Sequence, residues 1–588
     1  MKTKLIFLLA ALLIASCKNP KVENNDLSKL FENYYTESLS LYPLNATING
    51  DIGYNNLLRN DITQEFKSEE KTFYSKYLNL LKNYDLNKLT DKDKISYKLL
   101  KWKCEDNLER LKFHYELIPI NQIFSLHIRI GQFAGGTSVQ PFKTVKDYQD
   151  WLLRVDGFIV WCDTAVVNMK RGIKQGYVLP KALAEKVIPQ LEDLAKGPAV
   201  ENLFYKPILS FPEGFSQENK EKIKAAYRTK IENAIIPNFQ KLENFFKKEY
   251  LPQCRETSGI CALPGGKEYY AFLIKEYTTT NLSADEIFNI GQKEVELITN
   301  EMEKVKEQVG YKGDLISFLD FVRNNKQLMP YKTPEEIINH FKGIKKIVEG
   351  NIKNLFDVYP HTQLEIRREP AFSEKSAAAH YVPGSLNRSR PGIFYLPIPD
   401  SSKYNIFEDE DIFLHEGIPG HHLQISIQNE DTTLPKFQTK LFLSAYGEGW
   451  GLYAESLGKD LGLYTDPYQY FGMLSSEMHR SIRLVVDVGI HSKGWTREQA
   501  IKYSLEHEAA PEQFIISEVE RYMAGPGQAL SYKIGQLKII ELRHKAEKEL
   551  GSKFDIRKFH HKVLESGCIP LTLLEQRINI WIEEEKKI

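Results

Sequence analysis

The sequence HEGIPGHH, residues 415–422, is the stretch around which the whole chain is organised. It places four side chains suited to metal binding or acid–base chemistry within eight residues, and Glu448 follows about thirty residues later. Catalytic zinc is commonly held by two histidines and one glutamate, which leaves one coordination position for water. The pattern therefore predicts a zinc hydrolase site with one ion, in which Glu416 removes a proton from that water.

The spacing of the histidines is incompatible with an unbroken helix. In the familiar zinc-peptidase helix the two ligands lie four residues apart, and Pro419 occupies that position here. On a regular helix His421 would point about 240° away from His415, and His422 would lie about 10 Å further along the axis. Neither could share an ion with His415, so we expect the helix to break within residues 417–420, where glycine and proline permit it.

Further motifs follow in a fixed order. They are EGW at 448–450, GIH at 489–491, GWT at 494–496 and PGQA at 526–529. With residues 415–424, they make the chain resemble a bacterial family of unknown function, number 885, which is placed among the gluzincin metallopeptidases with thimet oligopeptidase and the Taq-type carboxypeptidases. The resemblance covers nearly all of the mature chain. It implies a mostly helical peptidase with a deep cleft and a single zinc ion.

The resemblance also orders the candidate ligands. The Gly-His pair of those peptidases corresponds to Gly420 and His421, which favours His421 over His422 as the second ligand beside His415 and Glu448. In the implied mechanism Glu416 deprotonates the water that attacks the peptide carbonyl and then passes the proton to the leaving amine.

One further carboxylate lies on the same helical face as Glu448. Glu455 follows Glu448 by seven residues, which is close to two helical turns. It would either hold a zinc-ligating imidazole through the second ring nitrogen or be a surface or ion-paired glutamate.

The negative charge that develops on the substrate carbonyl oxygen requires a hydrogen-bond donor. Tyr532 is the first candidate, with Tyr522 and His491 as reserves, and each of these residues could instead belong to the core.

A helix predicted around residues 478–487 carries two arginines. Arg483 and Asp487 lie one turn apart and are expected to pair, and Arg480 shares their face. The alternative is that Arg480 or Arg483 binds a substrate carboxylate through two parallel hydrogen bonds.

Two segments before the zinc stretch have the patterns of strands. Residues 363–368 alternate apolar and charged side chains, and residues 392–396 form an apolar run that ends before Pro397. The proline suggests an edge strand. In the related peptidases an edge strand pairs with the extended substrate, so the second segment is expected either to bind substrate or to form a structural hairpin.

The N-terminus has the pattern of a lipoprotein signal. Lys2 and Lys4 precede an apolar run at 5–14, and Ala15-Ser16 stand before Cys17. We expect cleavage after residue 16, lipid attachment to Cys17 and a tether over 17–30, in the envelope of a bacterium. An ordinary signal peptide followed by a chance cysteine is the alternative.

The composition restricts the partners. Lys plus Arg equal Asp plus Glu at 78 each, so nucleic acid or an acidic membrane surface is not expected as a partner. Membrane contact is expected through Cys17 alone, because no later run reaches about 18 apolar residues. Cys254 and Cys261 could form a small disulfide loop or remain free thiols.

The expected fold is mainly α, with two lobes, a deep cleft and a small β-sheet beside the zinc helix. Amphipathic helices, including 27–41, 73–84 and 158–169, build an N-terminal lobe at 31–265. Gly259–Gly266 marks the boundary, and 266–588 form the catalytic lobe. Capping boxes are predicted at Ser283/Glu286, Thr333/Glu336 and Thr496/Gln499, and residues 559–574 are expected to form a closing helical hairpin.

The predicted function is hydrolysis of short peptides by a zinc-dependent peptidase. Two alternatives are open: a catalytically inactive surface lipoprotein that binds peptides, and a zinc amidase acting on cell-wall peptides.

Overall fold

The computed structural model describes residues 25–136, 138–371, 374, 377–385, 390–508 and 510–587. The predicted signal peptide, Cys17 and the tether through residue 24 lie outside these residues. The tether was expected to extend to residue 30, and this prediction is wrong for residues 25–30. Helix α1 (Asn25–Leu41) already begins at Asn25, and Leu27 and Leu30 are buried. Burial of their apolar side chains outweighs the entropy that a disordered tether would retain.

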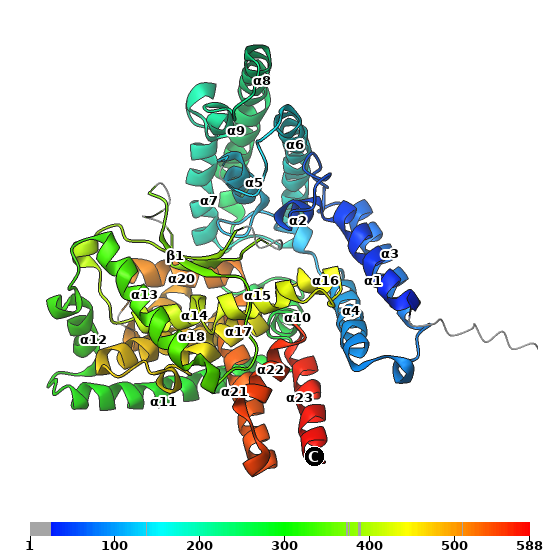
Figure 1. Cartoon of the computed structure of the whole chain (residues 1–588). Coiled ribbons are helices and arrows are strands. Elements are labelled where there is room, and N and C mark those ends of the chain that lie inside the picture. The colour runs from blue at the N-terminus through cyan, green and yellow to red at the C-terminus, as the bar shows by residue number, and fades with distance from the viewer. Residues whose placement is uncertain are drawn as a thin grey trace, which may run out of the picture.

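The fold is mainly α-helical, as predicted, with one small sheet. One group of helices stands apart at the top of Figure 1 and has a hydrophobic core of its own, with Trp151, Phe158 and Phe239 buried in it. Its members are α5 (Leu126–Ala134), α6 (Val145–Gln175), α7 (Lys181–Leu194), α8 (Gln217–Lys230) and α9 (Ile236–Phe245).

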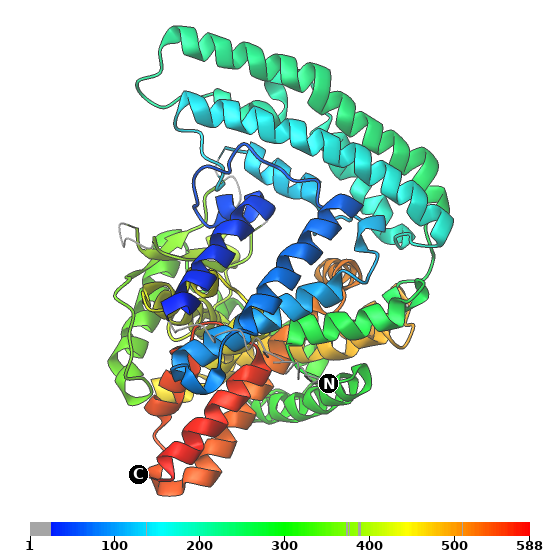
Figure 2. The same ribbon diagram turned by 90° about the vertical axis from the view of Figure 1, so that its right-hand side faces the viewer.

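A second, larger core joins the two ends of the chain. The first helices contribute to it together with the C-terminal half, so this core does not follow the lobe boundary expected at 265–266. Figure 2 shows the blue helices α1 and α3 between the helices α6–α9 above and the red helix α23 below. The N-terminal helices after α1 are α2 (Pro43–Ile48), α3 (Gln64–Leu81) and α4 (Asp91–Arg110).

The C-terminal half supplies the other helices. They are α10 (Gly266–Thr278), α11 (Ala284–Gln308), α12 (Leu315–Asn324), α13 (Pro334–Asn351), α14 (Asp409–Glu416), α15 (His421–Glu430), α16 (Lys436–Thr439), α17 (Ser444–Glu455), α18 (Pro467–His491), α19 (Arg497–His507), α20 (Glu512–Ala524), α21 (Ser531–Leu550), α22 (Ile556–Leu564) and α23 (Leu571–Glu585). The predicted capping boxes of α11, α13 and α19 are present, and α22 and α23 form the expected terminal hairpin. None of the described helices is long and apolar enough to cross a bilayer.

The sheet has the strand order β1-β3-β2. Strand β1 (Leu364–Arg368) confirms the predicted strand and runs parallel to β3 (Gly392–Leu396), while β2 (His380–Val382) runs antiparallel to it. The prediction that residues 392–396 form an edge strand is therefore wrong, because β3 is central. Pro397 follows the strand, so its missing N–H removes no bond from the ladder.

Helix α17 is held in place by an unusually close approach to α21. A Cβ atom on Gly535 would lie 1.9 Å from the carbonyl oxygen of Ala445, and one on Gly449 would lie 2.5 Å from Gly535. Glycine at both positions lets the two backbones meet. This packing fixes the position of α17 and therefore of Glu448, which lies in the middle of that helix. Cys254 and Cys261 are free thiols, so the possible disulfide is not formed.

Candidate metal centre

The predicted break in the zinc stretch is present. Helix α14 ends at Glu416, Ile418 and Pro419 are joined by a cis peptide bond, and α15 begins at His421. The turn folds back so tightly that a Cβ atom on Gly420 would lie 1.9 Å from the carbonyl oxygen of His415. Only glycine fits there, and the fold-back places His421 beside His415.

The turn is also tied to the helix that carries the third candidate ligand. The indole Nε1 of Trp450 on α17 donates to the carbonyl oxygen of Pro419 at 2.9 Å. Trp450 is fully buried, so this bond is shielded from water. It fixes α17 against the turn and brings Glu448 to face the two histidines.

Three side chains converge at this point. Nε2 of His415 and Nε2 of His421 each lie 3.5 Å from Oε2 of Glu448, and the ring centroids of the two histidines are 4.7 Å apart with the rings nearly perpendicular. Candidate ligand atoms of all three residues lie within 4.8 Å of one another. Two ligands on a tetrahedral zinc ion are about 3.4 Å apart, so the donor set and its spacing fit one such ion.

The electrostatics of the triad suit a cation. Burial works against ionisation of Glu448, but hydrogen bonds from His415 and His421 outweigh it and lower the pKa of the carboxyl group. Burial likewise opposes a charge on His415, yet hydrogen bonds to Glu448 and Glu455 raise its pKa. The carboxylates thus stabilise positive charge between the rings, where a divalent cation would take the place of protons.

Glu455 lies behind His415. Its carboxylate accepts a hydrogen bond of 2.6 Å from Nδ1 of His415 and is almost fully buried. When Nδ1 carries the proton of a neutral imidazole, the lone pair of Nε2 is available to a metal ion between the rings. Glu455 is thus buried and contacts a candidate ligand, as the first of its two alternatives predicts, and does not lie at the surface. His421 differs, because its buried Nδ1 has no hydrogen-bond partner among the described residues.

Sequence reasoning missed Asp411. This fully buried carboxyl group hydrogen-bonds to Glu455, and burial followed by the charge of Glu455 raises its pKa well above the ordinary value. Two carboxyl groups so close together in a buried site oppose each other's ionisation. The sequence contained one indication that Asp411 lies near the metal centre. It precedes His415 by four residues, which places it one turn earlier on the same helical face.

His422 points away from the triad. Its Nδ1 is 3.1 Å from the hydroxyl of Tyr381 on β2, and burial lowers its pKa to about 4. The structure therefore brings His421, and not His422, to His415 and Glu448.

Comparison with known proteins places the chain in a family. A family described as "Bacterial protein of unknown function (DUF885)" matches residues 43–578. The chain belongs to this family. A crystal structure of a "putative lipoprotein" from Colwellia psychrerythraea is similar over 95% of this chain and 99% of that one, with 27% identity and a TM-score of 0.87.

A second structure has the same fold as this DUF885 member. It is a "putative lipoprotein of unknown function" from Shewanella oneidensis, with 18% identity, a TM-score of 0.74, and coverage of 94% of this chain and 99% of that chain. No curated protein matches the sequence.

The three candidates for stabilising the oxyanion have different environments. Both nitrogens of His491 are occupied by backbone groups, since Ile260 N donates to Nδ1 at 3.1 Å and Nε2 donates to Tyr522 O at 3.0 Å. His491 is fully buried, and burial lowers its pKa to about 3. It therefore has no donor left for a substrate, and its predicted catalytic role is not supported. His491 was selected because it lies in the GIH motif, and the structure shows that this position is buried and hydrogen-bonded to the backbone.

The two tyrosines also differ. The hydroxyl of Tyr522 donates to Glu518 at 2.9 Å and accepts from Arg483 at 3.2 Å. Tyr532, the second residue of α21, is half-buried with its ring 4.7 Å from the guanidinium of Arg483, and its hydroxyl makes no hydrogen bond with a described residue. Tyr532 thus stays the preferred candidate.

The predicted pair between Arg483 and Asp487 is wrong. Arg483 binds Glu518 at 2.9 Å, whereas Asp487 accepts hydrogen bonds from the Tyr270 hydroxyl at 2.6 Å and from Gly527 N at 3.1 Å. Each side chain forms its hydrogen bonds with a different neighbouring segment. These tertiary contacts decide the partners of Arg483 and Asp487 although the two residues lie only one helical turn apart.

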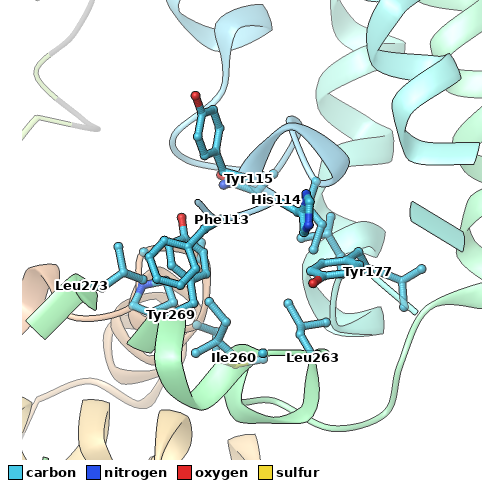
Figure 3. A pocket seen from close by; sticks show the side chains of 18 of the residues that line it. Phe113, His114, Tyr115, Tyr177, Ile260, Leu263, Tyr269 and Leu273 are labelled. Carbon is cyan, nitrogen blue, oxygen red and sulfur yellow. The ribbon is translucent and has the colours of Figure 1, made fainter. Parts of the chain in front are cut away.

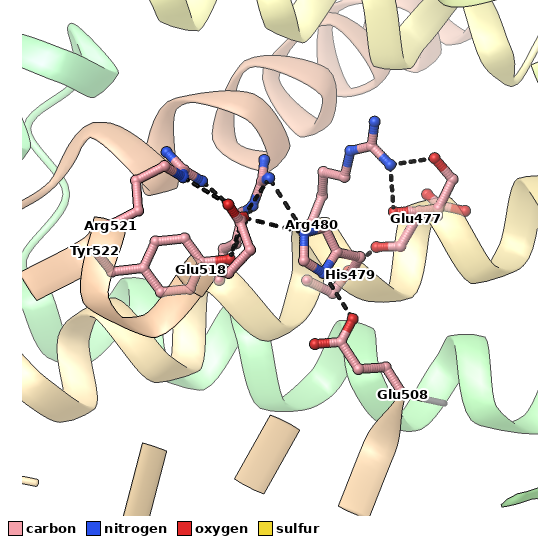
Figure 4. Close-up of polar contacts among 10 residues, drawn as sticks. Glu477, His479, Arg480, Glu508, Glu518, Arg521 and Tyr522 are labelled. Carbon is pink, nitrogen blue, oxygen red and sulfur yellow. Dashed lines mark hydrogen bonds and ion pairs between the residues drawn. The ribbon is translucent and has the colours of Figure 1, made fainter. Parts of the chain in front are cut away.

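Glu518 is the centre of a polar cluster shown in Figure 4. Arg521 also binds it at 2.8 Å, and His479 lies between Glu518 and Glu508. This network occupies Arg483 and makes it unsuitable for a substrate carboxylate. Arg480 donates to the carbonyl of Ser476 at 3.1 Å.

Proposed function

We propose that this DUF885 member is a zinc-dependent peptidase that hydrolyses short peptides. The observation that carries the proposal is the convergence of His415, His421 and Glu448, with Nε2 of each histidine 3.5 Å from one oxygen of Glu448. Two histidines and one glutamate are the ligand set of a catalytic zinc site with an open position, whereas structural zinc sites are closed by four protein ligands.

The chemistry that follows uses groups of this chain. When bound, zinc would act as a Lewis acid and lower the pKa of a water molecule to about 7. Glu416 adjoins His415, is half-buried, and makes no hydrogen bond with another described residue, so its carboxylate is free to accept a proton. It then returns that proton to the leaving amine. The free hydroxyl of Tyr532 is the proposed donor to the carbonyl oxygen as negative charge develops there.

The sheet supports the same proposal in a corrected form. Since β3 is central, it cannot pair with a substrate, but β2 pairs only with β3 within the described residues. Tyr381 on β2 contacts His422, the neighbour of His421, so β2 runs close to the metal centre. We assign to the outer edge of β2 the role of pairing with an extended peptide.

The proposed location is the bacterial cell envelope, with lipid attached to Cys17. The sequence before Cys17 has the pattern of a lipoprotein signal, and the structures from Colwellia psychrerythraea and Shewanella oneidensis are each described as a "putative lipoprotein".

Metal analysis and a cleavage screen test the proposal together. Purified protein should contain about one zinc ion per chain and cleave members of a mixed peptide library. Glu416→Gln should retain zinc and lose activity by about 100-fold or more, because the proton acceptor is removed while the ligands remain. Glu232→Gln, which changes an exposed carboxylate on the distant helices, is the matched control.

The alternatives predict other results. Zinc-loaded protein that binds peptides without cleaving any would be an inactive peptide-binding lipoprotein. Cleavage restricted to a panel of cell-wall muropeptides would identify an amidase, and full activity of Glu416→Gln would remove Glu416 from the mechanism.

A further inference from the structure

A cavity of about 470 Å³ lies where the two hydrophobic cores meet. Val178 and Leu179 line it from the α5–α9 side, and Ile260, Leu263 and Leu273 line it from the side of the larger core. Its lining residues include none of the three candidate metal ligands, and they do not include Glu416. It is therefore a site separate from the metal centre, bounded by both parts of the fold.

Aromatic rings form much of its wall, as Figure 3 shows. Phe113 and Tyr269 stack with centroids 4.7 Å apart, and His114 meets Tyr177 edge to face at 5.7 Å. These pairs lie around an open centre, so flat apolar surfaces face the cavity from different directions. Such a wall suits an aromatic ring or a large aliphatic side chain.

Arg255 is a cation of this wall that is only partly exposed, whereas Lys112, the lysine of the lining, is exposed. Nε of Arg255 donates to the carbonyl oxygen of Val178 at 3.1 Å, and Nη1 donates to the carbonyl oxygen of Thr257. Among the described residues no carboxylate forms an ion pair with Arg255. Glu268 is the one acidic residue of the lining, and it is exposed.

Arg255 is held rigidly in this position. Its backbone N–H donates to Leu179 at 3.1 Å, and its carbonyl accepts from Lys181 at 2.9 Å. Burial lowers its pKa to about 10, so the guanidinium still carries its charge at neutral pH. A charge that is largely removed from water and lacks a counter-ion is costly, and a ligand carboxylate would relieve that cost through a charge-assisted hydrogen bond.

We infer that this cavity binds the C-terminal residue of a peptide, with the terminal carboxylate on Arg255 and an aromatic or large apolar side chain between the rings. The inference rests on the proposed function for the identification of the ligand as a peptide.

The cavity and the metal centre are joined through one loop. Residues 523–526 line the cavity, and the chain then leads to Ser531, whose hydroxyl is 2.6 Å from that of Ser444. Ser444 precedes Glu448 by one turn of α17. Because the cavity and the metal centre share no residues, a peptide that occupies both must extend from its C-terminal residue in the cavity to upstream residues at the metal. The inference thus favours substrates of several residues with a bulky apolar C-terminus.

Calorimetric titration tests the inference independently of turnover. The ligands are acetyl-Ala-Ala-Phe as the free acid, the same peptide with an amidated C-terminus, and acetyl-Ala-Ala-Gly as the free acid. Each peptide is titrated into full-length Glu416→Gln protein, once in the zinc-loaded form and once after the zinc has been removed by a chelator. The second titration is needed because the free carboxylate of a peptide could otherwise bind the metal. The Phe acid should bind about tenfold or more tightly than the amide and the Gly acid, in both metal states.

Two substitutions locate the binding. Arg255→Gln should abolish the difference between acid and amide, whereas Arg171→Gln, which removes an exposed arginine from neighbouring α6, should preserve it. Tyr177→Ala should reduce the preference for Phe over Gly while keeping the acid–amide difference, and this variant remains informative if Arg255→Gln misfolds.

Equal affinity for acid and amide, or discrimination that survives in folded Arg255→Gln protein, would overturn the inference. So would acid preference that disappears on chelation, because the metal would then be the anchor. A protein that binds these peptides as expected but cleaves none would instead contradict the peptidase proposal and leave the cavity assignment standing.

Discussion

Gly451 on α17 faces the imidazole ring of His415 with no space for a side chain between them. A Cβ atom at position 451 would lie 2.7 Å from Cε1 and 2.9 Å from Nδ1 of that ring. The ring cannot retreat freely, because its Nδ1 is bonded to the buried Glu455. The metal centre is thus assembled by close approach of a helix backbone to a ligand.

Gly451→Ala is expected to weaken zinc binding by about tenfold or more, because the added methyl group must displace His415 from its bond to Glu455. Competition with a chromogenic chelator measures the affinity. Gly343→Ala is the control, since this exposed glycine inside α13 faces open space. It should leave zinc affinity unchanged and stabilise the fold by about 0.5–1 kcal/mol. Wild-type zinc affinity in Gly451→Ala would show that the ring tolerates displacement.

The adjacent histidines should respond differently to the same substitution. His421→Gln should lower zinc affinity by more than about 100-fold, because it removes a proposed ligand, whereas His422→Gln should retain zinc because His422 points to Tyr381. Zinc content after dialysis against a weak chelator distinguishes them. Loss of zinc only in His422→Gln would reverse the assignment of the second ligand.

Glu455→Gln should lower zinc affinity by about 10–100-fold without unfolding the protein. The glutamine still accepts a hydrogen bond from His415, but the negative charge that strengthens the ligand is lost. Asp411→Asn should have a smaller effect, since the amide can donate a hydrogen bond to Glu455 and adds no negative charge beside it. Equal losses in both variants would mean that geometry, and not charge, accounts for the role of Glu455.

Acidification should destabilise the fold through buried neutral histidines. Burial lowers the pKa of His491 and of His560 to about 3 in each case, whereas an unfolded histidine titrates near 6.5. Their contribution to stability is fully present above about pH 6.5 and is lost as the pH falls toward 3, by roughly 2 kcal/mol each at pH 5. Urea-unfolding midpoints at pH 7 and pH 5 measure this effect. In His491→Gln the urea-unfolding midpoint should fall less between pH 7 and pH 5 than it does in the wild-type protein. An equal fall in both proteins would exclude His491 as a contributor to the pH dependence.

Much of the site follows from local sequence. The break at 417–420 was predictable because helical geometry forbids His415 and His421 from meeting without it. The N-terminal caps of α11, α13 and α19 were predictable because a capping box uses residues only three positions apart. Glu455 could be placed near the zinc stretch because helical periodicity puts it on the face of Glu448.

Other features depended on which elements pack together. Strand β3 proved central because β1 and β2 join it on both sides, and an apolar run does not encode the number of its neighbours. Arg483 pairs with Glu518 and not with Asp487, since a partner on another helix is invisible to spacing along one helix. His491 is bonded to two backbone segments that lie far apart in the sequence.

The sequence by itself determined the donor types, the break that lets them meet and the helical class of the fold, because each is dictated by contacts between residues close along the chain. Only the tertiary structure decided which histidine faces Glu448, which strand is central, and that Arg255 lies in an aromatic cavity between two cores without an ion-pair partner among the described residues. Those outcomes depend on packing between distant segments, where burial and the available hydrogen-bond partners select one arrangement from several that the local pattern allows.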